Sequence, residues 1–165
     1  MRPVIMISRL RLTMGFLLFT SVIGLCSEPD LLNKRLKLLA GETATDCGTV
    51  GIREDASSAS LCAEKSFSAK RAFVVRYRLQ GIDSEVMVAL AGTNSGHVYA
   101  VQYDSMGWSS EGLGKNARLL DGNHDVVEQC PLPVQLRKTR SHRLTCFPPD
   151  PNAKGNIMSP TMEPY

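Results

Sequence analysis

The sequence predicts an α+β domain of two layers, in which one main helix packs on an antiparallel sheet of four to five strands. Three patterns support this fold. Apolar and polar residues alternate along 73–80, and two further strand-like segments follow at 85–91 and 98–103. Apolar residues recur at every fourth position within 57–70, and two short strand-like runs occupy 134–147. The expected sheet is therefore a β-meander plus a terminal hairpin, with the helix covering its apolar face.

Residues 1–26 have the pattern of a secretory signal peptide. A basic start precedes an apolar run that is shorter than the ~20 residues of a comfortable membrane span. Cleavage after Gly24 or after Cys26 fits the preference for small residues at such sites. A lipidated Cys26 is a third interpretation, but lipidation sites usually have a small residue just before the cysteine, and here that residue is Leu25. We favour a Cys26 that leaves with the signal, because an even number of cysteines then remains. The signal predicts a secreted or periplasmic protein in an oxidising compartment.

Residues 27–41 predict a short amphipathic spacer helix, with Asp30 as its N-cap and Gly41 just beyond its C-terminus. Leu32, Leu36 and Leu39 fall on one face. Such a helix can lie on a membrane surface or pack on its own domain. We favour packing on the domain, because a helix of about ten residues is marginal alone.

The disulfide-stabilised domain is predicted to span residues 42–147. A loop over 42–56 leads into the main helix, where Ala59, Ala63 and Phe67 form one apolar stripe. This stripe should pack on the meander and bury the helix on one side.

The three meander strands differ in their expected exposure. Strand 73–80 is predicted to have one solvent-exposed face, whereas 85–91 is apolar on both faces and should lie centrally. Residues 104–128 lose this periodicity and are predicted to form a long loop, which is typical of functional or mobile segments.

The last part of the domain predicts a hairpin. Residues 134–137 and 142–147 form its strands, and Pro133 indicates an edge position because proline cannot donate to a ladder. Residues 148–165 are rich in proline and poor in apolar residues, so they predict a disordered tail.

The cysteines beyond the signal form an even set that leaves no stray thiol. No C-x-x-C pair occurs, so structural disulfides are favoured over a redox or zinc site. Three connectivities are possible for Cys47, Cys62, Cys130 and Cys146. We favour 47–62 and 130–146, because each pair brackets a local unit, namely the loop with the helix and the terminal hairpin.

Composition argues against several classes of function. Three arginines of the signal account for the formal charge of +3, so the remaining chain is formally neutral. A neutral domain has no net positive potential to attract the phosphate backbone of a nucleic acid, so we expect no nucleic-acid partner. No second long apolar stretch occurs, so no membrane span is expected. The histidines lack metal-motif spacing and no G-x-S-x-G occurs, so we predict no cofactor, no metal and no catalytic residue.

Two basic groups remain, one on the first strand and one in the terminal hairpin. If the hairpin docks beside the first strand, the groups merge into one face, to which a loop tryptophan would add apolar area. Such a face would suit an acidic protein or glycan, although cations also decorate solvent faces and blunt sheet edges. The possible binding face comprises Arg76, Arg78, Trp108, Arg137, Arg140 and Arg143.

We therefore expect a secreted or cell-envelope binding module without enzymatic activity, whose ligand the sequence does not identify. The alternative is a small hydrolase or cation-dependent enzyme that uses the 104–128 loop, where His124 lies near Asp121 and Asp125. We favour the binding module, because a grouping of this kind is more often a solvated polar loop.

Overall fold

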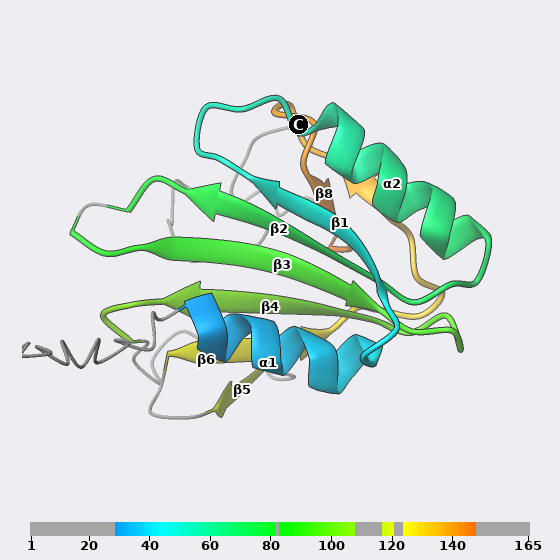
Figure 1. Cartoon of the computed structure of the whole chain (residues 1–165), viewed down its shortest axis with the longest axis horizontal. Helices are drawn as coiled ribbons and strands as arrows, with labels where there is room; N and C mark the ends of the chain where they lie inside the picture. The colour runs from blue at the N-terminus through cyan, green and yellow to red at the C-terminus, as the bar shows by residue number, and fades with distance from the viewer. Residues whose placement is uncertain (1–28, 82, 108–116, 121–123, 148–165) are drawn as a thin grey trace, which may run out of the picture.

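Figure 1 shows the computed structural model, which describes residues 29–81, 83–107, 117–120 and 124–147. The predicted signal peptide, Trp108, Asp121 and the predicted tail from 148 to 165 lie outside the described residues.

A six-stranded mixed sheet forms the centre of the fold, in the strand order β1-β2-β3-β4-β6-β5 (Figure 1). β2, β3 and β4 pair antiparallel, which confirms the predicted meander with β3 inside the sheet. β1 is parallel to β2, because helix α2 connects them and returns the chain to the same end of the sheet. The strands are β1 Thr45–Val50, β2 Phe73–Leu79, β3 Val86–Gly92, β4 Val98–Asp104, β5 Ala117–Leu120 and β6 Asp125–Gln129.

The predicted main helix is α2 (Ser57–Ser68), which packs on one face of the sheet. Ala59 and Ala63 of its predicted stripe are buried, and these small side chains let the helix lie close to β1 and β2. Phe73 and Tyr77 of β2 point into the same core. The alternation in β2 therefore places its large apolar side chains under α2, as the sequence predicts.

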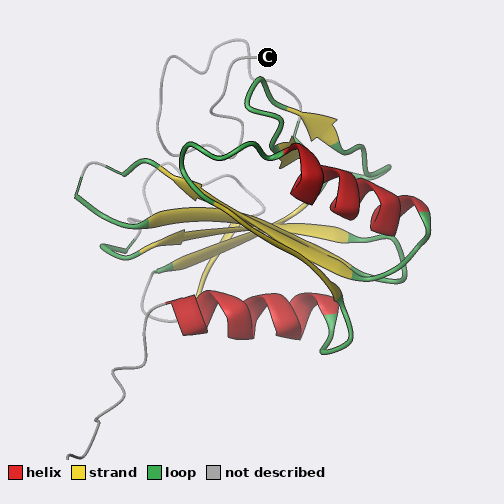
Figure 2. Ribbon diagram, turned by 45° about the horizontal axis from the view of Figure 1, so that its top comes forward, coloured by secondary structure: helices red, strands yellow, loops and turns green. Residues whose placement is uncertain are grey.

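Helix α1 (Pro29–Ala40) covers the opposite face of the sheet (Figure 2). Leu32 and Leu36 are only 1% and 0% exposed, so the helix packs on its own domain rather than frays. Within the described residues the sheet thus carries a helix on each face, where we predicted two layers and one main helix. The α1 side of the core comprises Leu32, Leu36, Val74, Met87, Ala89, Ala91, Val101 and Tyr103.

The ends of α1 agree with the sequence to within a residue. The helix begins at Pro29, one residue before the predicted N-cap. Gly41 has a φ of +92°, and its N–H donates to the Lys37 carbonyl at 2.8 Å. Glycine adopts this left-handed conformation at little cost, so Gly41 ends the helix as predicted.

The segment predicted as a loop, 104–128, contains strands β5 and β6. They pair antiparallel with each other, and β6 also pairs with β4. Asp125 is 3% exposed and lies 3.8 Å from the Arg35 guanidinium of α1, an ion pair that joins this edge of the sheet to the helix. The acidic residue that suggested a solvated loop is therefore buried.

The terminal hairpin is present but short, with β7 (Arg137–Lys138) paired to β8 (Leu144–Thr145) in a separate two-stranded sheet. It packs on the α2 side of the core through Leu144 and Cys146. Pro133 precedes β7 and lies in neither sheet, so it does not occupy the edge strand that we predicted. The hairpin forms a sheet of its own and adds no strand to the meander.

Both disulfides have the connectivity we favoured. Cys47 of β1 is joined to Cys62 of α2, and Cys130 after β6 is joined to Cys146 after β8. In the chain-entropy model, closing loops of 15 and 16 residues stabilises the fold by about 3 kcal/mol each. The bridges fasten α2 and the hairpin, the two elements that lie on the same face of the sheet.

Candidate functional site

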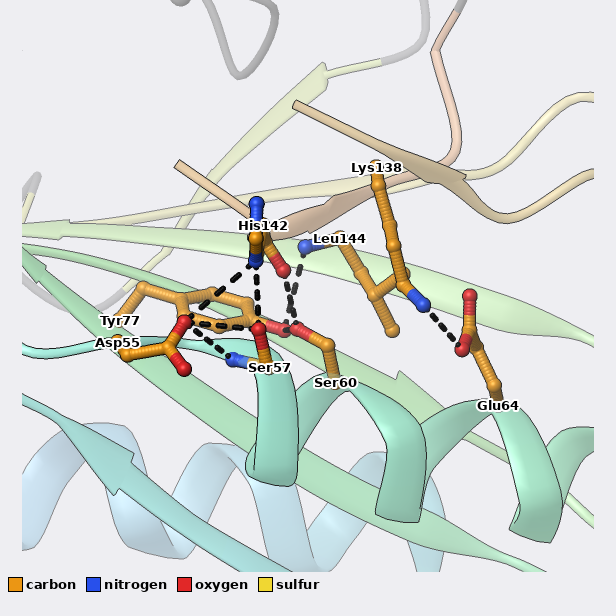
Figure 3. Close-up of polar contacts among 8 residues, drawn as sticks. All are labelled: Asp55, Ser57, Ser60, Glu64, Tyr77, Lys138, His142 and Leu144. Atoms are coloured by element: carbon orange, nitrogen blue, oxygen red, sulfur yellow. Dashed lines mark hydrogen bonds and ion pairs between the residues drawn. The ribbon is translucent and has the colours of Figure 1, made fainter. Parts of the chain in front are cut away.

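A polar cluster joins the start of α2 to the turn of the terminal hairpin (Figure 3). Its side chains come from the loop before α2, from α2 itself, from β2 and from the hairpin. The members are Asp55, Ser57, Ser60, Glu64, Tyr77, Lys138, His142 and Leu144.

Asp55 lies two residues before α2 begins and binds Ser57, the first residue of the helix. Its Oδ1 accepts hydrogen bonds from the Ser57 hydroxyl at 2.8 Å and from the Ser57 backbone N–H at 3.1 Å. These bonds lower the pKa of Asp55, because they stabilise the carboxylate over the neutral acid. Asp55 is therefore an anion near neutral pH. It accepts the hydrogen bond that the single hydroxyl hydrogen of Ser57 can donate.

His142 of the hairpin also contacts Ser57. Its Nδ1 lies 2.6 Å from the Ser57 hydroxyl oxygen and 3.5 Å from Asp55 Oδ1. Because Ser57 already donates its proton to Asp55, we assign Nδ1–H as the donor to Ser57. The other ring nitrogen points away from the cluster (Figure 3).

The backbone of His142 has a φ of +63°, which is uncommon for a residue with a side chain. It closes the hairpin turn, where its N–H donates to the Thr139 carbonyl at 3.0 Å and Thr139 N–H donates to the Arg143 carbonyl at 2.8 Å. The carbonyl of His142 accepts a 2.7 Å hydrogen bond from the Ser60 hydroxyl. Contacts on both sides of the peptide thus hold the residue in a left-handed conformation.

A buried chain of hydrogen bonds supports this turn from below. Leu144 N–H donates to the Tyr77 hydroxyl at 3.2 Å, and the Tyr77 hydroxyl lies 2.9 Å from the Ser60 hydroxyl. Because the Ser60 hydroxyl uses its single hydrogen in the bond to the His142 carbonyl, Tyr77 must be the donor in the bond between the two hydroxyls. Burial raises the pKa of Tyr77, so its hydroxyl stays neutral and can fill both roles. We call the chain Leu144–Tyr77–Ser60–His142 the turn lock.

An ion pair near the turn lock also joins the hairpin to α2. Lys138 Nζ of β7 lies 2.8 Å from the Glu64 carboxylate of α2 (Figure 3). Both side chains are partly exposed, so we expect a contribution of no more than about 1 kcal/mol.

Serine, histidine and aspartate in contact invite comparison with a hydrolytic triad, but the connectivity differs. In a triad the histidine stands between the other two residues, with one ring nitrogen on the serine and the other on the acid. Here Ser57 and Asp55 both lie beside Nδ1 of His142, and the acid binds the serine directly. The arrangement therefore links the start of α2 to the turn of the hairpin.

The structure separates the two halves of the predicted binding face. Arg137, Arg140 and Arg143 belong to the hairpin segment on the α2 side of the sheet. Arg76 and Arg78 alternate with Tyr77 along β2 and so point to the other face, which α1 covers. The hairpin packs over α2 and Tyr77 on one face of the sheet and does not pair with the edge of β2, so Arg76 and Arg78 lie on the opposite face from the three hairpin arginines.

The alternative enzyme hypothesis rested on His124 and the nearby Asp121 and Asp125, and two of these side chains have partners in the fold. Nδ1 of His124 lies 3.0 Å from the carbonyl oxygen of Asp104, and the carboxylate of Asp125 pairs with Arg35. His124 also contacts the ring of Tyr103 at a centroid distance of 6.4 Å.

Sequence analysis did not single out Ser60 or Tyr77 as a polar pair. One signal was available, because Ser60 lies beside Ala59 and four residues after Ala56 on the buried side of α2. A hydroxyl at such a position needs a partner, and the alternation of β2 points Tyr77 toward it. His142 had no comparable signal, because its contacts join residues distant in sequence.

No family model, curated protein or solved structure matches the chain. The two disulfides indicate an oxidising, extracytoplasmic compartment. Among the described helices, neither is long and apolar enough to cross a membrane. The described residues also contain no group of three or more His, Cys, Asp or Glu side chains that could hold a metal ion.

Proposed function

We propose that the protein is a non-enzymatic binding module, secreted or retained in the cell envelope, which presents its terminal hairpin to an anionic macromolecule. The observation that carries this proposal is the turn lock. It fixes a short hairpin that has four cations within seven residues, from Arg137 to Arg143.

Rigid display of these cations favours binding. Arg137, Lys138 and Arg140 are exposed, and Arg143 is half-buried against the Ile52 carbonyl at 3.3 Å. A preorganised surface loses little conformational entropy when a partner binds, so more of the interaction energy appears as affinity. Arginine also forms bidentate contacts with carboxylate and sulfate groups.

The geometry around His142 supports binding rather than hydrolysis. The hydroxyl of Ser57 donates to the Asp55 carboxylate, and His142 donates to that hydroxyl, so His142 is not placed to accept the serine proton as the histidine of a hydrolytic triad does. We expect Ser57 to resist labelling by a fluorophosphonate probe, as judged by intact mass. Labelling of Ser57 that disappears in His142→Asn would contradict the proposal.

Binding can be tested with heparin and poly-L-glutamate as two anionic probes on a sensor surface. The variant Arg137→Glu/Arg140→Glu should weaken binding tenfold or more, because it reverses two exposed charges of the hairpin. The control Lys65→Glu/Arg71→Glu makes the same change of net charge at exposed positions outside the hairpin. The proposal fails if the protein binds neither probe or if both variants lose the same affinity.

A further inference from the structure

The face opposite the hairpin contains a groove between α1 and the β1–β2 edge of the sheet. Its volume is about 530 Å³, within the ~300–1,000 Å³ range of small-molecule sites. The groove is lined by Asn33, Lys34 and Lys37 of α1, Asp46 and Thr49 of β1, and Arg76 of β2. Every lining side chain is polar or charged, so this groove is not an apolar docking surface.

Arg76 forms the inner wall of the groove, since its side chain is only 12% exposed. Nη1 donates to Asp46 Oδ1 at 2.8 Å, whereas Nε is buried and donates to no acceptor among the described residues. A guanidinium has five N–H donors. Among the described residues, this largely buried guanidinium therefore keeps N–H donors that the protein does not engage, at a side chain that lines the groove.

The β1 strand is shaped to bring acceptors to the same place. Asp46 and Thr49 are three residues apart and would face opposite sides of a regular strand. An irregularity in the β1–β2 register lies between them, and Gly48 there has a φ of +92°. Bulges of this kind re-aim side chains, and here both residues line the groove.

Asp46 remains a carboxylate in this setting. Burial disfavours the charged form, but hydrogen bonds from the Arg76 guanidinium and the Gly48 N–H outweigh it and lower the pKa of Asp46. The groove therefore offers a fixed acceptor beside its cations, which a bare inorganic anion would not use.

The helix supplies the second wall. Lys34 and Lys37 are three residues apart and so lie on neighbouring positions of one face of α1. Lys37 pairs with Glu42 at 3.2 Å, but both side chains are more than half exposed and can separate at little cost. Together with Arg76, the two lysines bring three cationic side chains to the lining of the groove, where Asp46 is the one carboxylate.

We propose that this groove binds a small anion that also carries hydroxyl groups, of the sugar-acid type. The anionic group would bind Arg76 and the lysines, while hydroxyls would donate to Asp46 and exchange hydrogen bonds with Thr49 and Asn33. This site is independent of the hairpin proposal, because the two surfaces lie on opposite faces of the sheet.

Calorimetric or NMR titration with D-glucuronate, methyl glucoside and inorganic phosphate tests the site. Glucuronate should bind at least tenfold more tightly than either of the other probes, since it alone combines both kinds of group. Lys34→Gln/Lys37→Gln should weaken glucuronate binding tenfold or more, whereas Lys65→Gln/Arg71→Gln should leave it unchanged. Both variants alter exposed or partly exposed side chains, so the fold is expected to persist.

Other outcomes overturn the proposal. The absence of saturable glucuronate binding would reject the site, and equal affinity for phosphate would reject the role of the hydroxyl groups. Binding that survives the double lysine variant would place the ligand elsewhere. Since Arg137→Glu/Arg140→Glu should leave glucuronate binding intact, loss of one function does not imply loss of the other.

Discussion

Replacing Tyr77 by phenylalanine should destabilise the protein by about 2 kcal/mol, although the change removes one oxygen atom. The Tyr77 hydroxyl accepts from Leu144 N–H and donates to Ser60, and both partners are buried. A buried donor left without an acceptor costs about 1–3 kcal/mol, and the lost bond to Ser60 adds about 1 kcal/mol. Relief from burying the phenol oxygen offsets part of this sum.

Urea unfolding with the disulfides intact would measure this change as a lower midpoint at an unchanged m-value. Tyr99→Phe is the matched control, because Tyr99 is a half-buried residue whose hydroxyl makes no hydrogen bond within the described residues, and we expect a loss within about 0.5 kcal/mol. Ser60→Ala in a double-mutant cycle with Tyr77→Phe should show a coupling of about 0.5 kcal/mol or more. Equal losses in Tyr77→Phe and Tyr99→Phe would refute the hydrogen-bond chain.

Three further predictions concern other parts of the molecule. His142→Asn should keep the left-handed turn that His142→Val disfavours, so the valine variant should be less stable by a further ~1–2 kcal/mol in urea unfolding; equal stability would contradict the constraint. Because the pKa of Asp46 is lowered in the folded protein, its contribution should be full above its ordinary pKa of 3.8 and vanish as pH falls through the folded-state value. The difference in unfolding free energy between wild type and Asp46→Asn should therefore shrink below about pH 4, and a constant difference would argue against the ion pair. Finally, an alkylating reagent should add no mass to Cys47, Cys62, Cys130 or Cys146 before reduction and one group to each afterwards.

The sequence predicted elements whose evidence is local. Alternation in 73–80 and the four-residue repeat in 57–70 each bury one side of an element, so β2 and α2 follow from neighbouring residues. The apolar residues on both faces of 85–91 also indicate a second covering layer. A strand buried on both faces requires cover on both, and α1 supplies the second cover.

Other features depend on contacts that no local pattern records. β6 contains Asp125, whose charge suggests a loop until Arg35 of α1 is placed beside it. Likewise, the exposure of Arg76 depends on β1 adding in parallel next to β2, and the site of the hairpin depends on Tyr77 meeting Leu144. These long-range pairings explain why the predicted basic face was divided between two sides of the sheet.

The order of the disulfides along the chain has a consequence for oxidative folding. Each bridge joins consecutive cysteines, Cys47 with Cys62 and Cys130 with Cys146. Because the chain is synthesised from its N-terminus, Cys47 and Cys62 can meet before Cys130 is available, and pairing these four cysteines in order of appearance gives the native connectivity. Oxidation can then close β1 onto α2 early, without later reshuffling by an isomerase. The Cys130–Cys146 bridge would form last, because Cys146 follows all six strands of the main sheet in the sequence.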